Sequence, residues 1–273
     1  MYCPRFAVPL QKIFNNITKN MIKAMILAAA ALTMGATTVD AQTMIEKNNI
    51  KVENHLMTPE ALWAMGRIGA AEASPNGKQV VYQVGYYSVK ENKSHQMLFI
   101  MDANGKNQKA LTTDAKSESD AAWIQGGQKI AFIRGGQLWS MNPDGTGRKQ
   151  LTNDKLGIQG FRFSPDGKKV ILIKELPYHG TIKENPSDLP LATGRLVTDM
   201  NYRHWDHYVE SLLHPFVADV AEDGTVNAGE DILKDEPFEC PMAPFGGIEQ
   251  LAWSPDSKTI AYTCRKKEGV QYA

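Results

Sequence analysis

The sequence predicts an all-β fold, an incomplete β-propeller of about five four-stranded blades, because one short turn sequence recurs along it. Ser-Pro-Asn/Asp-Gly/Ser-Lys occurs at residues 74–78, 164–168 and 254–258, and a degenerate copy, Ile-Gln-Gly-Gly-Gln, occurs at 124–128. Pro presets the first turn angle, and Asn or Asp followed by Gly accepts the positive φ of a tight hairpin. Each turn leads into a short run of β-branched and aromatic residues, which is typical of a strand.

A second block repeats between these turns. Leu-Phe-Ile-Met-Asp at 98–102 and Leu-Trp-Ser-Met-Asn at 138–142 are each followed by an Asn-Gly or Asp-Gly turn and a Leu-Thr pair. The four copies of the first turn begin at residues 74, 124, 164 and 254. The intervals between them are 50, 40 and 90 residues, so the last interval has room for two units. A period near 40 to 50 residues with four strands per unit is typical of propeller blades. A β-sandwich, the alternative, would not repeat one turn sequence at fixed spacing.

Residues 1–41 have the order of a secretory signal peptide. Basic residues precede an apolar run from Ala24 to Thr37, and small residues stand before an expected cut at Gln42. The apolar run of about 14 residues is shorter than the roughly 20 that cross a bilayer as a helix. We therefore expect export to the periplasm without a stable membrane anchor. A buried core helix is the alternative, and Met21 is a second possible translation start.

The exported part divides into residues 42–70, an N-terminal segment with a short helix, and residues 71–273, a partial propeller. Thr58 as N-cap, Pro59 at the first helical position and Glu60 in the first turn predict the helix. Between Leu176 and Pro190 a stretch with Pro, Asn and Ser indicates an inserted loop.

Charge and cysteine content restrict the function classes. The 273 residues carry 30 basic and 30 acidic side chains, and this balance argues against a nucleic-acid-binding protein. Without residues 1–41 the chain is mildly acidic, with 26 basic and 29 acidic residues. Cys240 and Cys264 then remain, and they either pair in an oxidising compartment or are buried as small apolar thiols.

The repeats resemble those shared by TolB-like proteins and the prolyl oligopeptidase family. A Thr-Pro-Glu helix running into the first turn is similar to the start of many of those peptidases. Tyr-Arg-His-Trp-Asp-His-Tyr-Val-Glu at 202–210 and Pro-Phe-Val-Ala-Asp-Val at 215–220 resemble the dipeptidyl-peptidase 5 and acylaminoacyl-peptidase branch. The resemblance covers residues 57–273. It implies the substrate-gating propeller of an exported serine exopeptidase that acts on short peptides and releases dipeptides.

In that family the propeller covers a C-terminal α/β-hydrolase domain, whose nucleophile is the Ser of a Gly-x-Ser-x-Gly elbow. No Ser in this sequence has Gly two positions before and two after it, and the sequence stops within a repeat. We therefore expect the hydrolase domain to be missing, and we assign no catalytic residue and no cofactor. The alternative is a non-catalytic TolB-like periplasmic propeller that binds peptides or proteins.

The candidate substrate contacts lie in the 202–210 segment. If this segment faces the hydrolase cavity, Asp206 or Glu210 can meet the free amino terminus of a peptide and Arg203 a carbonyl or carboxylate group. The alternative is that these charges pair within the blade. A metal site is not assigned, because His204 and His207 would face opposite sides of a strand and no third ligand follows at a zinc-like spacing.

Overall fold

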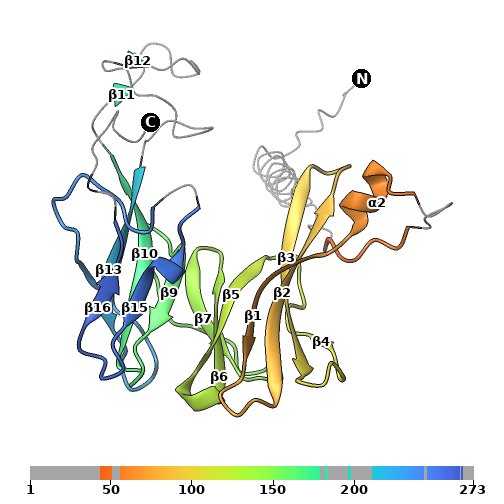
Figure 1. Ribbon diagram of the computed structural model, residues 1–273, viewed down its shortest axis with the longest axis horizontal. Coiled ribbons are helices and arrows are strands. Elements are labelled where there is room, and N and C mark those ends of the chain that lie inside the picture. The colour runs from red at the N-terminus through yellow and green to blue at the C-terminus, as the bar shows by residue number, and fades with distance from the viewer. Residues whose placement is uncertain are drawn as a thin grey trace, which may run out of the picture. The chain divides into compact units, whose positions relative to one another are not determined.

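The computed structural model describes residues 44–50, 56–178, 182–183, 196–197, 211–242, 245–264 and 266 (Figure 1). The chain divides into two compact units, Met1–Thr43 and Met44–Ala273, and every described residue lies in the second. The expected signal peptide at 1–41 lies outside the described residues, so it stays a prediction.

The predicted helix is present as α2 (Pro59–Ala64). The Thr58 hydroxyl accepts a hydrogen bond from the backbone N–H of Ala61 at 3.2 Å, which satisfies one of the unpaired donors of the first turn. Pro59 occupies the first helical position, where a missing N–H costs nothing. The N-cap prediction is therefore confirmed.

Three antiparallel sheets of four strands follow, and we call them blades I, II and III. Blade I contains β1 (Arg67–Ala73), β2 (Gln79–Ser88), β3 (Lys93–Asp102) and β4 (Lys109–Ala110). Blade II contains β5 (Glu118–Ile124), β6 (Lys129–Arg134), β7 (Gln137–Met141) and β8 (Lys149–Gln150). Blade III contains β9 (Gly160–Phe163), β10 (Lys169–Pro177), β13 (Ser211–Asp219) and β14 (Glu230–Asp231). A fourth sheet pairs β15 (Leu251–Trp253) with β16 (Ile260–Tyr262).

The all-β prediction is confirmed, but the described residues form three full blades and two strands of a fourth sheet where the sequence predicted about five blades. The interval between the turns at 164–168 and 254–258 has room for two repeats, and the residues of it that the structure describes contain one four-stranded sheet, blade III. Its extra length lies between β10 and β13, where β11 (Ile182–Lys183) pairs with β12 (Leu196–Val197). The first strand also begins at Arg67, inside the predicted N-terminal segment.

The repeated turns use their Ser as well as their Gly. The Ser74 hydroxyl donates to Asn76 at 2.8 Å and accepts from the N–H of Gln79 at 2.9 Å. Ser164 and Ser254 make the same pair of bonds in their own turns. Gly77 has a φ of 68°, in the left-handed region that the turn requires. Each turn is thus closed by its own side chains, which explains why the sequence repeats so closely.

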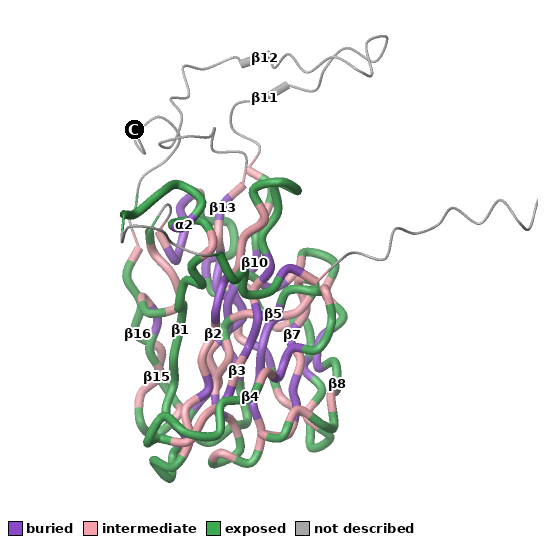
Figure 2. The backbone as a smooth tube through the Cα atoms, turned by 90° about the vertical axis from the view of Figure 1, so that its right-hand side faces the viewer, coloured by how far each residue is buried: buried purple, intermediate pink, exposed green. Residues whose placement is uncertain are grey.

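A separate apolar core lies at each junction between neighbouring sheets, and its buried residues run along the central strands (Figure 2). Blades I and II share a cluster that includes Leu98 and Phe132, and blades II and III share one that includes Leu138 and Leu172. The Trp123 indole N–H also donates to the Glu72 carbonyl of β1 at 3.1 Å. Each sheet therefore depends on its neighbours to bury its apolar faces.

Candidate functional site

Arg203, Asp206 and Glu210, the substrate contacts expected from the sequence, lie outside the described residues, as do His204 and His207. The structure does describe the two strand ends from which their segment departs. Pro177 at the end of β10 is the cross-strand partner of Ser211 at the start of β13, and the Ser211 hydroxyl donates to the carboxylate of Glu175. The segment therefore leaves and returns at neighbouring positions of the two central strands of blade III.

The end of β10 and the start of β13 lie at the end of the blades opposite the Ser-Pro turns (Figure 1). The central strands of blade I are 10 residues long and those of blade III are 9, whereas β6 and β7 of blade II have 6 and 5. The hairpins of blades I and III therefore extend past blade II on this side.

A buried lysine lies in β10, three residues before the end of the strand at Pro177. Lys174 of β10 is 1 % exposed, and its ammonium group donates to Asp154 Oδ2 and to the Ala228 carbonyl oxygen, each at 2.5 Å. Its nitrogen also lies 4.2 Å from the centre of the Phe216 ring. The lysine therefore has two oxygen partners and an aromatic face in place of water, as a buried charge requires.

A buried histidine pairs across the strands with this lysine. His214 is the register partner of Lys174, and its Nδ1 lies 2.9 Å from Asp231 Oδ2. The carboxylate fixes the orientation of the imidazole ring. Its Nε2 atom has no hydrogen-bond partner among the described residues. Because His214 is only 4 % exposed, the arrangement supports the strand ends and does not present a group to substrate.

Blades I and II bury a carboxylate at their junction. Glu118 is fully buried and accepts hydrogen bonds from Thr112 Oγ1 at 2.8 Å and Arg134 Nη1 at 2.8 Å. Arg148 donates to the same carboxylate and to the Leu111 carbonyl. Arg134 also binds Asp114 at 2.7 Å, and this bond lowers the pKa of the Asp114 carboxyl. Two arginines thus neutralise two carboxylates at this junction.

The junction between blades I and II and the junction between blades II and III each contain an ion pair that recurs with the repeat. The sequence analysis missed this feature. Asp114 and Arg134 are each 40 residues before Asp154 and Lys174, and both pairs bridge one blade to the next. The same spacing relates Lys109 and Lys149, whose ammonium groups each donate at 2.6 Å to an Asp carbonyl oxygen of the following blade. The signal was available in the repeat, because charged residues recur at fixed positions beside the apolar ones.

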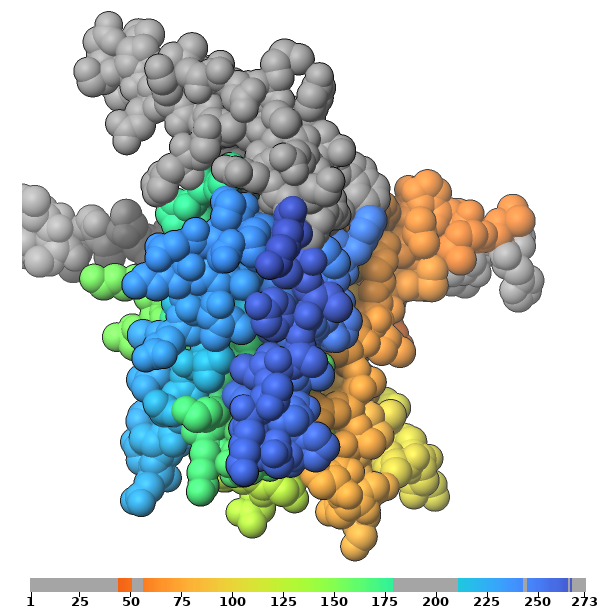
Figure 3. Space-filling model, turned by 60° about the vertical axis from the view of Figure 1, so that its left-hand side comes forward, coloured from red at the N-terminus to blue at the C-terminus, as the bar shows by residue number. Residues whose placement is uncertain are grey.

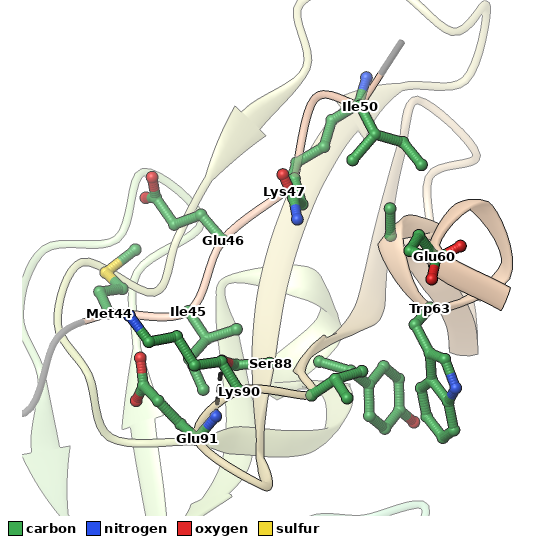
Figure 4. Close-up of a pocket in the computed structure, with 14 residues that line it drawn as sticks. Met44, Ile45, Glu46, Lys47, Ile50, Glu60, Trp63, Ser88, Lys90 and Glu91 are labelled. Carbon is green, nitrogen blue, oxygen red and sulfur yellow. Dashed lines mark hydrogen bonds between the residues drawn. The ribbon is translucent and has the colours of Figure 1, made fainter. Parts of the chain in front are cut away.

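A pocket of about 500 Å³ lies at the same end of blade I, between α2, the β2–β3 turn and residues 44–50 (Figure 4). The Ile45 carbonyl accepts a hydrogen bond from His95 Nδ1 at 2.9 Å, which fixes this segment to β3. Trp63 meets Tyr87 edge to face at 5.6 Å between ring centres, and the Arg67 guanidinium carbon is 4.3 Å from the centre of the Tyr87 ring. Its lining includes both acidic and basic side chains, and among the lining residues that the structure describes no nucleophile is paired with a base.

Within the described ranges no group of three or more His, Cys, Asp and Glu is placed to hold a metal ion. In the same ranges the structure contains no helix of the length and apolarity needed to cross a membrane.

Comparison with known proteins identifies the family. The chain is 40 % identical over 225 residues to dipeptidyl-peptidase 5 of Porphyromonas endodontalis, which covers 81 % of this chain and 32 % of that protein. It is 42 % identical over 258 residues to dipeptidyl-peptidase 5 of Porphyromonas gingivalis, covering 93 % of this chain and 36 % of that protein. The chain belongs to the prolyl oligopeptidase family, as a propeller portion of one of its members. It spans about a third of the length of these relatives.

The resemblance drawn from the repeats and the 202–210 segment is therefore confirmed at the level of the family. Among solved structures, the Pyrococcus horikoshii acylaminoacyl peptidase aligns with a TM-score of 0.45 and 14 % identity over 62 % of this chain and 26 % of that chain. None of the protein-family profiles matches the chain.

Proposed function

We propose that this propeller portion gates the substrate of an exported serine exopeptidase that acts on short peptides and releases dipeptides. The observation that carries the proposal is the 40 % and 42 % identity to two proteins named dipeptidyl-peptidase 5, over most of this chain. The reaction would be acyl transfer through a serine ester with a preorganised oxyanion hole. No Ser of this sequence lies in a Gly-x-Ser-x-Gly elbow, so a hydrolase domain outside this sequence supplies the nucleophile.

The contribution of this chain is to hold the substrate-contacting segment. Its two ends are fixed by the Pro177–Ser211 register pair, directly above the buried Lys174 and His214. From that position Asp206 or Glu210 binds the amino terminus of the peptide and Arg203 binds a carbonyl or carboxylate oxygen. Charge-assisted hydrogen bonds of this kind are the strong ones, and they distinguish a free amino terminus from a blocked one.

Kinetics of the complete protein test this assignment. Asp206→Asn, Glu210→Gln and Arg203→Met are compared on a dipeptidyl chromogenic substrate and on its N-acylated analogue. Loss of a contact to the amine raises KM for the free substrate by about 10- to 100-fold, the equivalent of a charged hydrogen bond. The acylated analogue has no charged amine, so its KM changes little in the carboxylate variants.

Glu222→Gln serves as the matched control, because Glu222 is an exposed carboxylate in the turn after β13, at the Ser-Pro end of the blades. It should leave both substrates unchanged. If none of the three site variants alters KM, or if the two carboxylate variants affect free and acylated substrates equally, the assignment of these residues is wrong.

The second candidate is a TolB-like propeller that binds peptides or proteins without cleaving them. The repeated turn and the Leu-Thr block, which that class shares, favour it. Residues 42–273 alone should release no product from the chromogenic substrate under either proposal. Peptide binding by a complete protein that has no Gly-x-Ser-x-Gly elbow would favour the TolB-like candidate, whereas hydrolysis by residues 42–273 alone would contradict both.

A further inference from the structure

Two cysteines lie where blade III meets the fourth sheet. Cys240 is fully buried, and its backbone N–H donates to the Leu213 carbonyl of β13 at 2.8 Å. Cys264 follows β16 and is partly exposed. Both side chains belong to one apolar cluster, which also contains Ile173, Leu233 and Leu251. The darkest blue residues, those of the fourth sheet, lie directly against blade III in Figure 3.

Contacts on both sides show that the two cysteine segments run past each other in opposite directions. On one side, the Lys266 ammonium lies 5.6 Å from the centre of the Phe238 ring. On the other side, Gln250 joins the segments: its side chain accepts from the N–H of Met242 at 2.9 Å, and its carbonyl accepts from the N–H of Thr263 at 3.2 Å.

This arrangement brings the two cysteines together. Cys240 lies between Phe238 and Met242 along the chain, and Cys264 lies between Thr263 and Lys266, so each cysteine lies between the two points at which the segments are in contact. Besides burial, Cys264 contributes to the raised pKa of the Cys240 thiol, which it can do only from nearby. A disulfide requires Cβ atoms roughly 3.5–4.5 Å apart, and formation of the bond brings the two side chains to that distance.

We propose that Cys240 and Cys264 form a disulfide that fastens the fourth sheet to blade III. Each of β15 and β16 has only three residues, so this sheet has few hydrogen bonds of its own and relies on the shared cluster. A covalent link across that cluster restricts the unfolded chain and keeps the short sheet against its neighbour.

The oxidant is an organic disulfide such as glutathione disulfide. Burial raises the pKa of the Cys240 thiol to about 12, so the partly exposed Cys264 reacts first. Its thiolate attacks one sulfur of glutathione disulfide and expels a glutathione thiolate. Cys240 then loses its proton to solvent, attacks the Cys264 sulfur of the mixed disulfide and expels the second glutathione. The protein loses two electrons and two protons, and one glutathione disulfide becomes two glutathione molecules.

The test uses the full chain with Cys3→Ser, which leaves only this pair of cysteines. The protein is equilibrated with glutathione disulfide, free thiols are blocked by alkylation under denaturing conditions, and peptides are mapped by mass spectrometry without reduction. We expect one cross-linked species that joins the peptides of Cys240 and Cys264, with the mass of two hydrogen atoms lost. Its melting temperature should rise relative to the reduced protein.

Two single variants are the controls. Cys264→Ser and Cys240→Ser should each show no cross-linked peptide, and the rise in melting temperature on oxidation should vanish in both. The peptide map of the chain that keeps both cysteines remains a valid test even if one of the single variants does not fold. The proposal fails if both thiols in that chain stay open to alkylation, or if each carries a separate glutathione.

Discussion

The junction between blades I and II and the junction between blades II and III use the same ion pair in different surroundings. The Asp114 side chain is 53 % exposed and its partner Arg134 15 %, whereas Asp154 is 10 % exposed and Lys174 only 2 %. The first junction adds the buried Glu118, and the corresponding position of the second is the apolar Ile158. The repeat therefore conserves the contact, while the neighbours decide how much the contact contributes to stability.

The largest effect is expected from Asp154→Asn. This change removes the negative charge that compensates the Lys174 ammonium and leaves it buried beside neutral oxygen atoms and the Phe216 ring. An uncompensated buried charge costs about 3–5 kcal/mol. Urea unfolding followed by tryptophan fluorescence should show a large fall in the midpoint. The double variant Asp154→Leu, Lys174→Met should recover most of the loss, because apolar replacement of a buried pair is often near neutral. A midpoint unchanged in Asp154→Asn would show that the pair contributes nothing.

Glu118→Gln should have an intermediate effect. The amide keeps an acceptor for Thr112 but removes the negative charge that Arg134 and Arg148 share, for a cost of about 1–3 kcal/mol. Arg134 retains Asp114, and Arg148 remains partly in water, so neither arginine is stranded. The same urea experiment measures it, with Glu222→Gln as a control that should leave the midpoint unchanged. A loss as large as that of Asp154→Asn would remove the distinction between the two junctions.

Asp114→Asn should have the smallest effect, below about 1 kcal/mol, because water screens this half-exposed pair. The hydrogen bond from Arg134 holds the pKa of Asp114 below the ordinary 3.8. Its contribution is therefore fully present above that value and is lost as the pH falls through the lower folded-state pKa. The difference in midpoint between wild type and variant should be measurable at about pH 7 and should shrink as the pH is lowered below the ordinary pKa of 3.8. A difference that stays the same over this pH range would assign the effect to packing.

The regular parts of the fold could be predicted from sequence because each is encoded within a few residues. The Thr58 cap and the turns that begin at Ser74, Ser164 and Ser254 are closed by side chains at most five residues away. The number of blades could not be predicted in the same way, because an insertion between β10 and β13 lengthens one repeat enough to resemble two.

The charged contacts escaped prediction for a different reason. Asp154 and Lys174 are separated by 20 residues, and Asp154 lies in the loop between β8 and β9 whereas Lys174 lies in β10, so the spacing of charges along one strand does not reveal their pairing. Only the comparison of repeats, Asp114 with Asp154 and Arg134 with Lys174, would have shown it. Arg203, Asp206 and Glu210 were selected through a family resemblance, and their role stays a proposal.

The Pro177–Ser211 pair has a consequence for how such proteins diversify. The inserted segment leaves and returns at neighbouring strand positions, so its length does not affect the register of β10 and β13. The free-energy cost of closing such a loop, which is entropic, rises slowly, by about 0.6 kcal/mol for each doubling of the loop length. Evolution can therefore lengthen, shorten or replace this segment at little cost to stability. Under the role proposed for this segment, such changes would alter substrate preference while the sheets that carry the segment stay the same.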